Sequence, residues 1–78
     1  MASAARHEAF RVLFEDIRVK WQWYDSELIR FRQLWKEGVG IRELAREFQT
    51  NARSIALVVI DQAEQGYIEK RPGGLFGN

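Results

Sequence analysis

The chain has 78 residues, which is room for one hydrophobic core and not for a second domain. Hydrophobic residues make up 46% and aromatic residues 13% of it, a composition typical of a packed globular domain and not of a disordered segment. Cysteine is absent, which excludes disulfides, thiolate nucleophiles and cysteine-based metal sites. The 12 basic and 11 acidic residues leave a net charge of +1, so any binding of a polyanion must depend on local groups of charge.

The first stretch, about residues 3–20, predicts an amphipathic helix. It contains no Gly or Pro, and its large apolar residues recur at three- and four-residue steps. These are Phe10, Leu13, Phe14, Ile17 and Trp21. The start of the chain lacks the apolar core of a signal peptide, and the longest apolar run, residues 55–60, is too short to cross a membrane. We therefore expect a cytoplasmic protein that does not contact membranes.

Two more helices are expected before residue 50. Leu28, Phe31, Leu34 and Trp35 share one helical face, and a helix over residues 26–37 would stop at Gly38. After Gly40, one face of a short helix is formed by Ile41, Leu44, Ala45 and Phe48. Gly38 and Gly40 mark the turn between these two helices.

A fourth helix is expected over residues 52–65. Asn51 is a good helix cap, and Gly66 is a good stop because glycine adopts the left-handed conformation without a Cβ penalty. Beyond Gly66 the chain is expected to be extended, since Pro72 forbids helix. Gly73 and Gly74 permit a tight reversal, after which residues 75–76 would return as a second short strand.

Two short helices joined by a three-residue turn describe a helix-turn-helix, with Leu44, Ala45, Phe48, Ile55 and Val58 as core positions. Residues 41–76 resemble, without a gap, the winged-helix domain of GntR-type bacterial regulators. The resemblance is carried by Arg42-Glu43-Leu44-Ala45, Ile55, Gly66-Tyr67-Ile68-Glu69-Lys70-Arg71-Pro72-Gly73 and Phe76. A weaker resemblance to homeodomain-like and GcrA-like proteins rests on Trp23, Asp25, Leu28, Leu34, Trp35 and Gly38.

The predicted fold is mainly α and has a single domain over residues 1–78. An N-terminal amphipathic helix occupies residues 1–22, a trihelical core of winged-helix type residues 23–66, and a short two-strand wing and tail residues 67–78. Two positions depart from the resembled pattern: Gln49 replaces the usual glycine of the inter-helix turn, and Gly40 replaces the usual Ser or Thr cap. Gln49 implies backbone strain if that position needs a positive φ.

The resemblance implies that the second helix of the motif enters the major groove of duplex DNA and that basic wing residues contact phosphate. By position, the expected DNA-binding residues are Arg42, Asn51, Ala52, Arg53, Ala56, Lys70 and Arg71. The side-chain chemistry suits Arg53, whose fork can bind a guanine edge, and Asn51, which can do the same for adenine.

Opposite its inward side chains Ile55, Val58, Val59 and Gln62, the fourth helix has an outer face that includes Arg53 and Ala56 and also points to a protein interface. It carries Leu57 and Ile60, which favour burial against another protein surface, and Glu64, which would repel phosphate. The cover is either the N-terminal stripe of Phe10, Leu13, Phe14 and Ile17, within one chain or swapped onto a second copy, or a different protein. All six apolar residues are candidate interface residues.

No group of residues predicts catalysis. His7 is the only histidine, and the pair Glu43 and Glu47 interleaves with Arg42 and Arg46 as a solvated, salt-bridged face would. We expect no enzyme activity, no metal and no cofactor. The hypothesis is a bacterial or phage-type transcription regulator that binds double-stranded DNA in a sequence-specific way as a homodimer. The alternative is an adaptor or inhibitor that uses a helix-turn-helix scaffold to bind a protein of the transcription or replication machinery.

Overall fold

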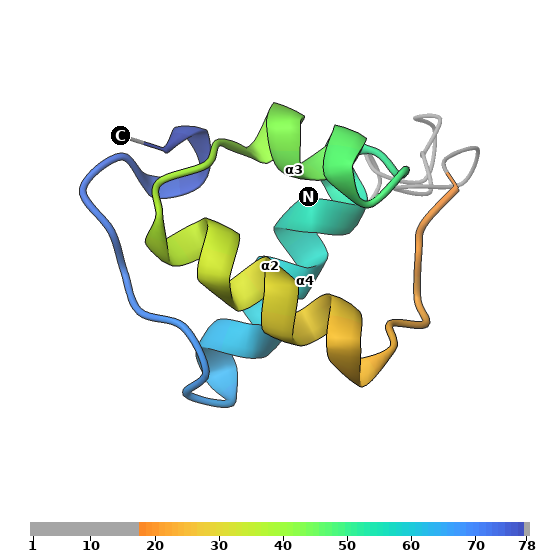
Figure 1. Cartoon of the computed structure of the whole chain (residues 1–78), viewed down its shortest axis with the longest axis horizontal. Helices are drawn as coiled ribbons and strands as arrows, with labels where there is room; N and C mark the ends of the chain where they lie inside the picture. Colours follow the sequence, from red (N-terminus) through yellow and green to blue (C-terminus); the bar gives the residue numbers. More distant parts are fainter. Residues whose placement is uncertain (1–17, 78) are drawn as a thin grey trace, which may run out of the picture.

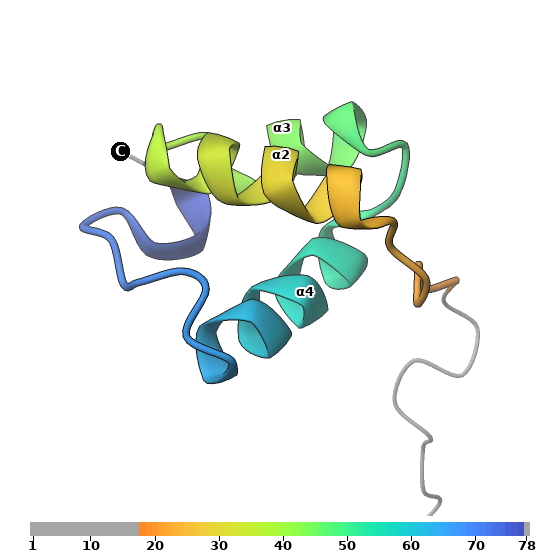
Figure 2. The ribbon, with the colours of Figure 1, turned by 60° about the horizontal axis from the view of Figure 1, so that its bottom comes forward.

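The computed structural model describes residues 18–77, coloured in Figure 1. In this part the chain forms three α-helices and one short 3-10 helix. They are α2 (Asp25–Lys36), α3 (Ile41–Glu47), α4 (Ala52–Glu64) and η1 (Gly74–Phe76). Figure 2 shows α4 crossing beneath α2 and α3. The predicted apolar stripe of Phe10, Leu13, Phe14 and Ile17 lies outside the described residues.

One cluster of aromatic and aliphatic side chains holds the three helices together. Phe31 of α2 is completely buried at its centre, with its ring centroid 6.2 Å from that of Trp23 and 6.3 Å from that of Phe48. Burying each large apolar side chain stabilises the fold by roughly 1.5–3 kcal/mol. The buried cluster comprises Phe31, Trp35, Ile41, Leu44, Ala45, Phe48, Ile55, Val58 and Ile68. The five predicted core positions of the helix-turn-helix are therefore confirmed as buried.

Residues 48–51 join α3 to α4 in a tight turn. The N–H of Thr50 donates to the carbonyl of Ala45 at 2.8 Å. Gln49 adopts φ 54°, so this position does need the positive φ that we expected to strain the backbone. At the other end of α4, Gly66 has φ 82° and the N–H of Tyr67 donates back to Gln62 at 2.8 Å. The predicted stop at Gly66 is confirmed.

The prediction of a two-strand wing is wrong. Residues 66–77, here named the C-terminal strap, contain no strand, and they return along the end of α2 to the start of α3 (Figure 1). Instead of forming a backbone ladder, the carbonyls of Glu69 and Gly74 accept hydrogen bonds from the side chains of Trp35 and Arg71. The last residues close into η1, where the N–H of Phe76 donates to Gly73.

The predicted N-terminal helix of residues 1–22 is also wrong over residues 18–22, which are not helical. Their backbone groups bond instead to the start of α4. The N–H of Lys20 donates to Oγ of Ser54 at 2.8 Å, and the side-chain amide of Asn51 donates to the carbonyl of Arg18 at 2.6 Å. Trp21, which the predicted stripe included, is 76% exposed.

Close packing of the strap explains one departure from the resembled pattern. A Cβ at Gly40 would lie 2.6 Å from the carbonyl oxygen of Phe76, so no Ser or Thr cap fits there. A Cβ at Gly77 would lie even closer to the carbonyl oxygen of Gly38. The glycines let the strap contact the turn between α2 and α3 backbone to backbone.

Gln49→Gly should stabilise the protein. Relief of the left-handed strain at φ 54° is worth about 1–2 kcal/mol, and the extra backbone entropy of glycine takes back part of it. We expect the free energy of unfolding, measured by urea denaturation with circular dichroism, to rise by about 0.5–1 kcal/mol. Gly66→Ala is the matched control, because it places a Cβ at φ 82° in open space and should lower that free energy by about 1 kcal/mol. A lower stability of Gln49→Gly would contradict the assignment of strain.

Candidate nucleic-acid interface

The start of α4 is the end of the molecule where the helix-turn-helix would meet a duplex. Ala52 and Arg53 occupy its first turn and are exposed, whereas Ser54 and Ile55 are completely buried. Ala56, one turn further on, is half-buried and packs against the core cluster. Of the predicted reading residues on α4, Ala52 and Arg53 therefore reach the surface most fully.

Asn51 is present at the predicted place but is engaged in the fold. Its side-chain oxygen accepts a hydrogen bond from the N–H of Ser54 at 2.9 Å, which caps α4 as expected. Its side-chain amide donates to the carbonyl of Arg18. Bidentate recognition of adenine needs both of these groups at once, so reading a base would require Asn51 to give up the cap.

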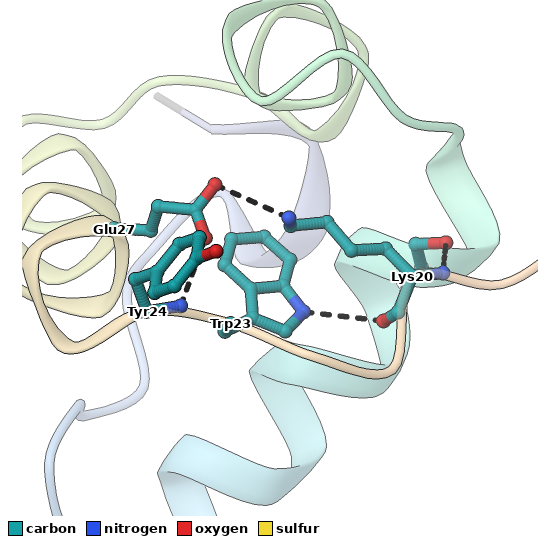
Figure 3. A network of polar contacts seen from close by, with 5 residues as sticks. Lys20, Trp23, Tyr24 and Glu27 are labelled. Atoms are coloured by element: carbon teal, nitrogen blue, oxygen red, sulfur yellow. Dashed lines mark hydrogen bonds and ion pairs between the residues drawn. The ribbon is translucent and has the colours of Figure 1, made fainter.

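Residues 18–24, here named the N-terminal arm, connect the start of α4 to the start of α2 (Figure 3). The indole N–H of Trp23 donates to the carbonyl of Lys20 at 3.2 Å, and the ammonium of Lys20 lies 3.1 Å from the carboxylate of Glu27. The same carboxylate accepts the N–H of Tyr24 at 2.9 Å. This backbone hydrogen bond lowers the pKa of Glu27, partial burial opposes the shift, and Lys20 adds to it.

The sequence did not reveal this arm, because the apolar periodicity of the first residues predicted a helix through residue 22. Lys20 and Trp23 are placed by contacts with Ser54 and with Phe48, residues more than 24 positions away in the chain, so no local signal predicts their position. The arm nevertheless decides the geometry of the site, because it lies against the first turn of the helix expected to read DNA.

On α3, Arg42 and Arg46 are exposed, and no hydrogen bond or ion pair engages either among the residues that the structure describes. Glu47 is different, since its carboxylate lies 2.7 Å from Nε of Arg30 on α2. The expectation of a solvated face is met, because all four side chains, Glu43 included, are exposed, but no salt bridge joins them, and Glu47 pairs with Arg30 of α2 instead.

Arg71 has a structural place in the strap. Its guanidinium lies 3.6 Å from the ring centroid of Trp35, and it donates to the carbonyls of Trp35, Val39 and Gly74, the last two at 2.7 and 2.6 Å. Burial lowers the pKa of this guanidinium, which still stays charged at neutral pH. Because its donors are taken up by carbonyls near the end of α2, the geometry does not favour the predicted phosphate contact of Arg71.

The predicted DNA-binding residues fall into two groups. Asn51, Ala52 and Arg53 lie at the start of α4, whereas Lys70 and Arg71 lie beyond its other end. The 13 residues of α4 span about 20 Å at a rise of about 1.5 Å per residue, and the strap that carries Lys70 and Arg71 packs against the second half of this helix, at Val59 and Ala63. The structure thus does not assemble the seven predicted residues into one compact site.

The predicted apolar face of α4 is only partly open. Leu57 is half-buried and borders a groove of about 290 Å³ that the N-terminal arm also lines through Trp21 and Trp23. Ile60 is 54% exposed. A second groove, of about 480 Å³, runs between Val59 and Ala63 of α4 and the strap. Ile60 therefore remains a candidate for contact with another protein.

Comparison with family models, with curated proteins and with solved structures found no match to this chain. Residues 18–77 include no helix that is both long and apolar enough to span a membrane. Within the same residues, no three His, Cys, Asp or Glu side chains come together in a way that could hold a metal ion.

Arg71→Ala should destabilise the fold by about 2 kcal/mol, because it leaves several carbonyls of α2 and the strap without their charged donor. Arg71→Lys should recover less than half of this loss, since an ammonium cannot reproduce the planar fork. Lys70→Ala, at the exposed neighbouring residue, is the control and should change the free energy of unfolding by less than about 0.5 kcal/mol. Equal effects of Arg71→Ala and Lys70→Ala in urea denaturation would refute the structural assignment.

Proposed function

We propose that this protein is a small cytoplasmic regulator that binds duplex DNA through its helix-turn-helix. The supporting observation is the arrangement of α3 and α4, two helices joined by a tight turn around buried Leu44, Ala45 and Ile55, with the first turn of α4 exposed. In this motif the start of the second helix is the part that enters the major groove. The resemblance to GntR-type regulators supports the same proposal through its helical part, Arg42-Glu43-Leu44-Ala45 and Ile55, and not through the wing.

The exposed residues suit base contact of a limited kind. Arg53 can present its fork to the N7 and O6 atoms of guanine, the commonest specific contact in the major groove. Ala52 is exposed and Ala56 is half-buried, and both are small, so they allow the helix to approach closely and Ala52 can contact a thymine methyl group. Sequence preference would therefore rest mainly on Arg53, with neighbouring thymines contributing through apolar contact.

Contacts with the DNA backbone would come from the arginines around this helix. Arg42 lies at the start of α3 and is exposed, and Arg18 is exposed where the N-terminal arm meets the cap of α4. Such contacts fix the orientation of the protein on the duplex without reading sequence. We assign Asn51 the role of a positioning residue. It caps the start of α4 and donates to the carbonyl of Arg18, so it holds this end of the helix and the arm together.

A second candidate function, protein binding, is favoured by the apolar outer face of α4. From residue 54 to residue 60 the helix has no charged side chain, and Ile60 is 54% exposed on it. A second copy of the chain is the partner that fits both candidates, since a homodimer would double the number of DNA contacts available to a domain this small.

Arg53→Ala should weaken binding of duplex DNA about 10-fold or more, because a bidentate contact with guanine is worth about 1–3 kcal/mol. The measurement is fluorescence anisotropy of a labelled duplex selected from a random pool, repeated at several salt concentrations. Binding by the unaltered protein should fall steeply as salt rises. Arg30→Ala removes the same charge from α2, where it is paired with Glu47, and should weaken binding less. Absence of duplex binding at low salt would refute the proposal.

Ile60→Glu tests the apolar face. If α4 pairs with a second copy, light scattering after size exclusion should show a dimer for the unaltered protein and a monomer for Ile60→Glu. Gln65→Glu is the control, because it adds the same charge to the exposed end of the same helix and should leave the dimer intact. A monomer at every concentration of the unaltered protein would exclude the homodimer.

A further inference from the structure

A groove between the second half of α2 and the C-terminal strap gathers positive charge. It encloses about 580 Å³, within the range of small-ligand sites. Four cationic side chains line it against one carboxylate, Glu69. The four are Arg32, Lys36, Lys70 and Arg71. This local excess contrasts with the chain as a whole, whose net charge is only +1.

Arg32 is held in place within this groove. Its Nε donates to Oε1 of Gln62 at 2.7 Å, and its guanidinium lies 3.9 Å from the ring centroid of Tyr67. Gln62 is 2% exposed and is itself oriented by a bond from its amide to Asp61 at 2.9 Å. This chain of contacts fixes the arginine fork while leaving its two terminal NH₂ groups without a partner in the described part of the chain.

The two lysines of the groove are not neutralised by the protein. Two cations elsewhere in the described residues are paired, Lys20 with Glu27 and Arg30 with Glu47, whereas Arg42 and Arg46 on α3 are not. Lys36 and Lys70 have no ion pair or hydrogen bond among residues 18–77. Arg71 adds positive charge to the groove, but its N–H groups already donate to the carbonyls of Trp35 and Val39. The groove therefore combines one preorganised fork with two adaptable ammonium groups.

We propose that this groove binds a phosphate group, gripped by Arg32 and by the ammonium groups of Lys36 and Lys70. A planar fork matches two phosphate oxygens, and lysine supplies mobile point charges around the remaining oxygens. The field of Arg71 adds to the attraction, and the single carboxylate of Glu69 does not cancel it. The phosphate belongs either to a small phosphorylated ligand or to the backbone of a nucleic acid. The proposal does not depend on base reading by the first turn of α4, because the groove lies beside Gln62 in the last turn of that helix.

The first test is a titration of the full chain with inorganic pyrophosphate, followed by nuclear magnetic resonance. The indole N–H of Trp35 and the amide of Tyr67 report on the groove, because both residues line it. We expect saturable shifts at these two positions and none at the amide of Leu57, which borders a different groove. The same shifts in sodium chloride of matched ionic strength would overturn the proposal, since they would reflect screening alone.

The variants Arg32→Gln and Lys36→Gln/Lys70→Gln test which side chains grip the phosphate. Each should weaken pyrophosphate binding about fivefold to tenfold, whereas Arg30→Gln, a matched change on the same helix outside the groove, should not. The double lysine variant keeps the test decisive if loss of the bond to Gln62 unfolds Arg32→Gln. Unchanged affinity in the double lysine variant would overturn the proposal.

Duplex DNA distinguishes the two sources of phosphate. If the groove binds the DNA backbone, Lys36→Gln/Lys70→Gln should lower the slope of log affinity against log salt by about 1 to 2. If it binds a small phosphorylated ligand, pyrophosphate binding should fall while the salt slope of DNA binding stays the same. Failure of the protein to bind any DNA would refute the proposed function but would leave the pyrophosphate result standing on its own.

Discussion

The contact between the guanidinium of Arg71 and the indole of Trp35 is the interaction on which the remainder of the architecture depends. Trp35 belongs to the buried core, and its indole N–H donates to the carbonyl of Glu69 in the C-terminal strap. The ring therefore connects the helices with the strap. Arg71 covers the ring and bonds to carbonyls at the end of α2, where a positive charge is favoured by the helix dipole. One side chain thus closes the end of a helix, covers an aromatic ring and anchors the strap.

The contact between Arg71 and Trp35 also determines how positive charge is distributed over the molecule. Because the guanidinium of Arg71 is hydrogen-bonded to carbonyls, Lys70 is the one cationic side chain of the strap that is available to a ligand. It lies in a groove with Arg32 and Lys36. The basic residues Lys70 and Arg71, expected in a two-strand wing, lie instead in the groove beside the last turn of α4. A molecule with a net charge of +1 can therefore present two separate basic regions, one at each end of the same helix.

The start of α4 illustrates how structural and functional demands meet at one residue. Asn51 has the side chain that could recognise adenine, yet it caps the helix and bonds to the N-terminal arm. Both uses need the same two polar groups, and the intramolecular one is already satisfied. Under the proposed function, base contact would rest on Arg53 and its small neighbours, and the arm would influence how the start of α4 is presented to DNA.

Local patterns determined the helices and their core. Apolar spacing predicted three of the helices to within one or two residues, and the positions that bury Leu44, Ile55 and Val58 follow from the 3.6-residue period alone. The stop at Gly66 was also predictable, because it depends on the backbone preference of a single glycine, whereas the strain at Gln49 was expected only through the resemblance, in which a glycine usually holds this position of the turn. These features involve contacts between near neighbours in the chain.

The path of the strap and the arm was decided only in the tertiary structure. Glycine and proline after Gly66 suit a hairpin as well as a strap, and the choice rests on Arg71 reaching Val39, 32 residues earlier. From the sequence, Gly40 stands where a Ser or Thr cap is usual. The tertiary structure gives the reason, because the carbonyl of Phe76 lies where a Cβ at this position would be. A sequence specifies local conformation residue by residue, but which carbonyl a distant side chain reaches depends on how the packed helices place it.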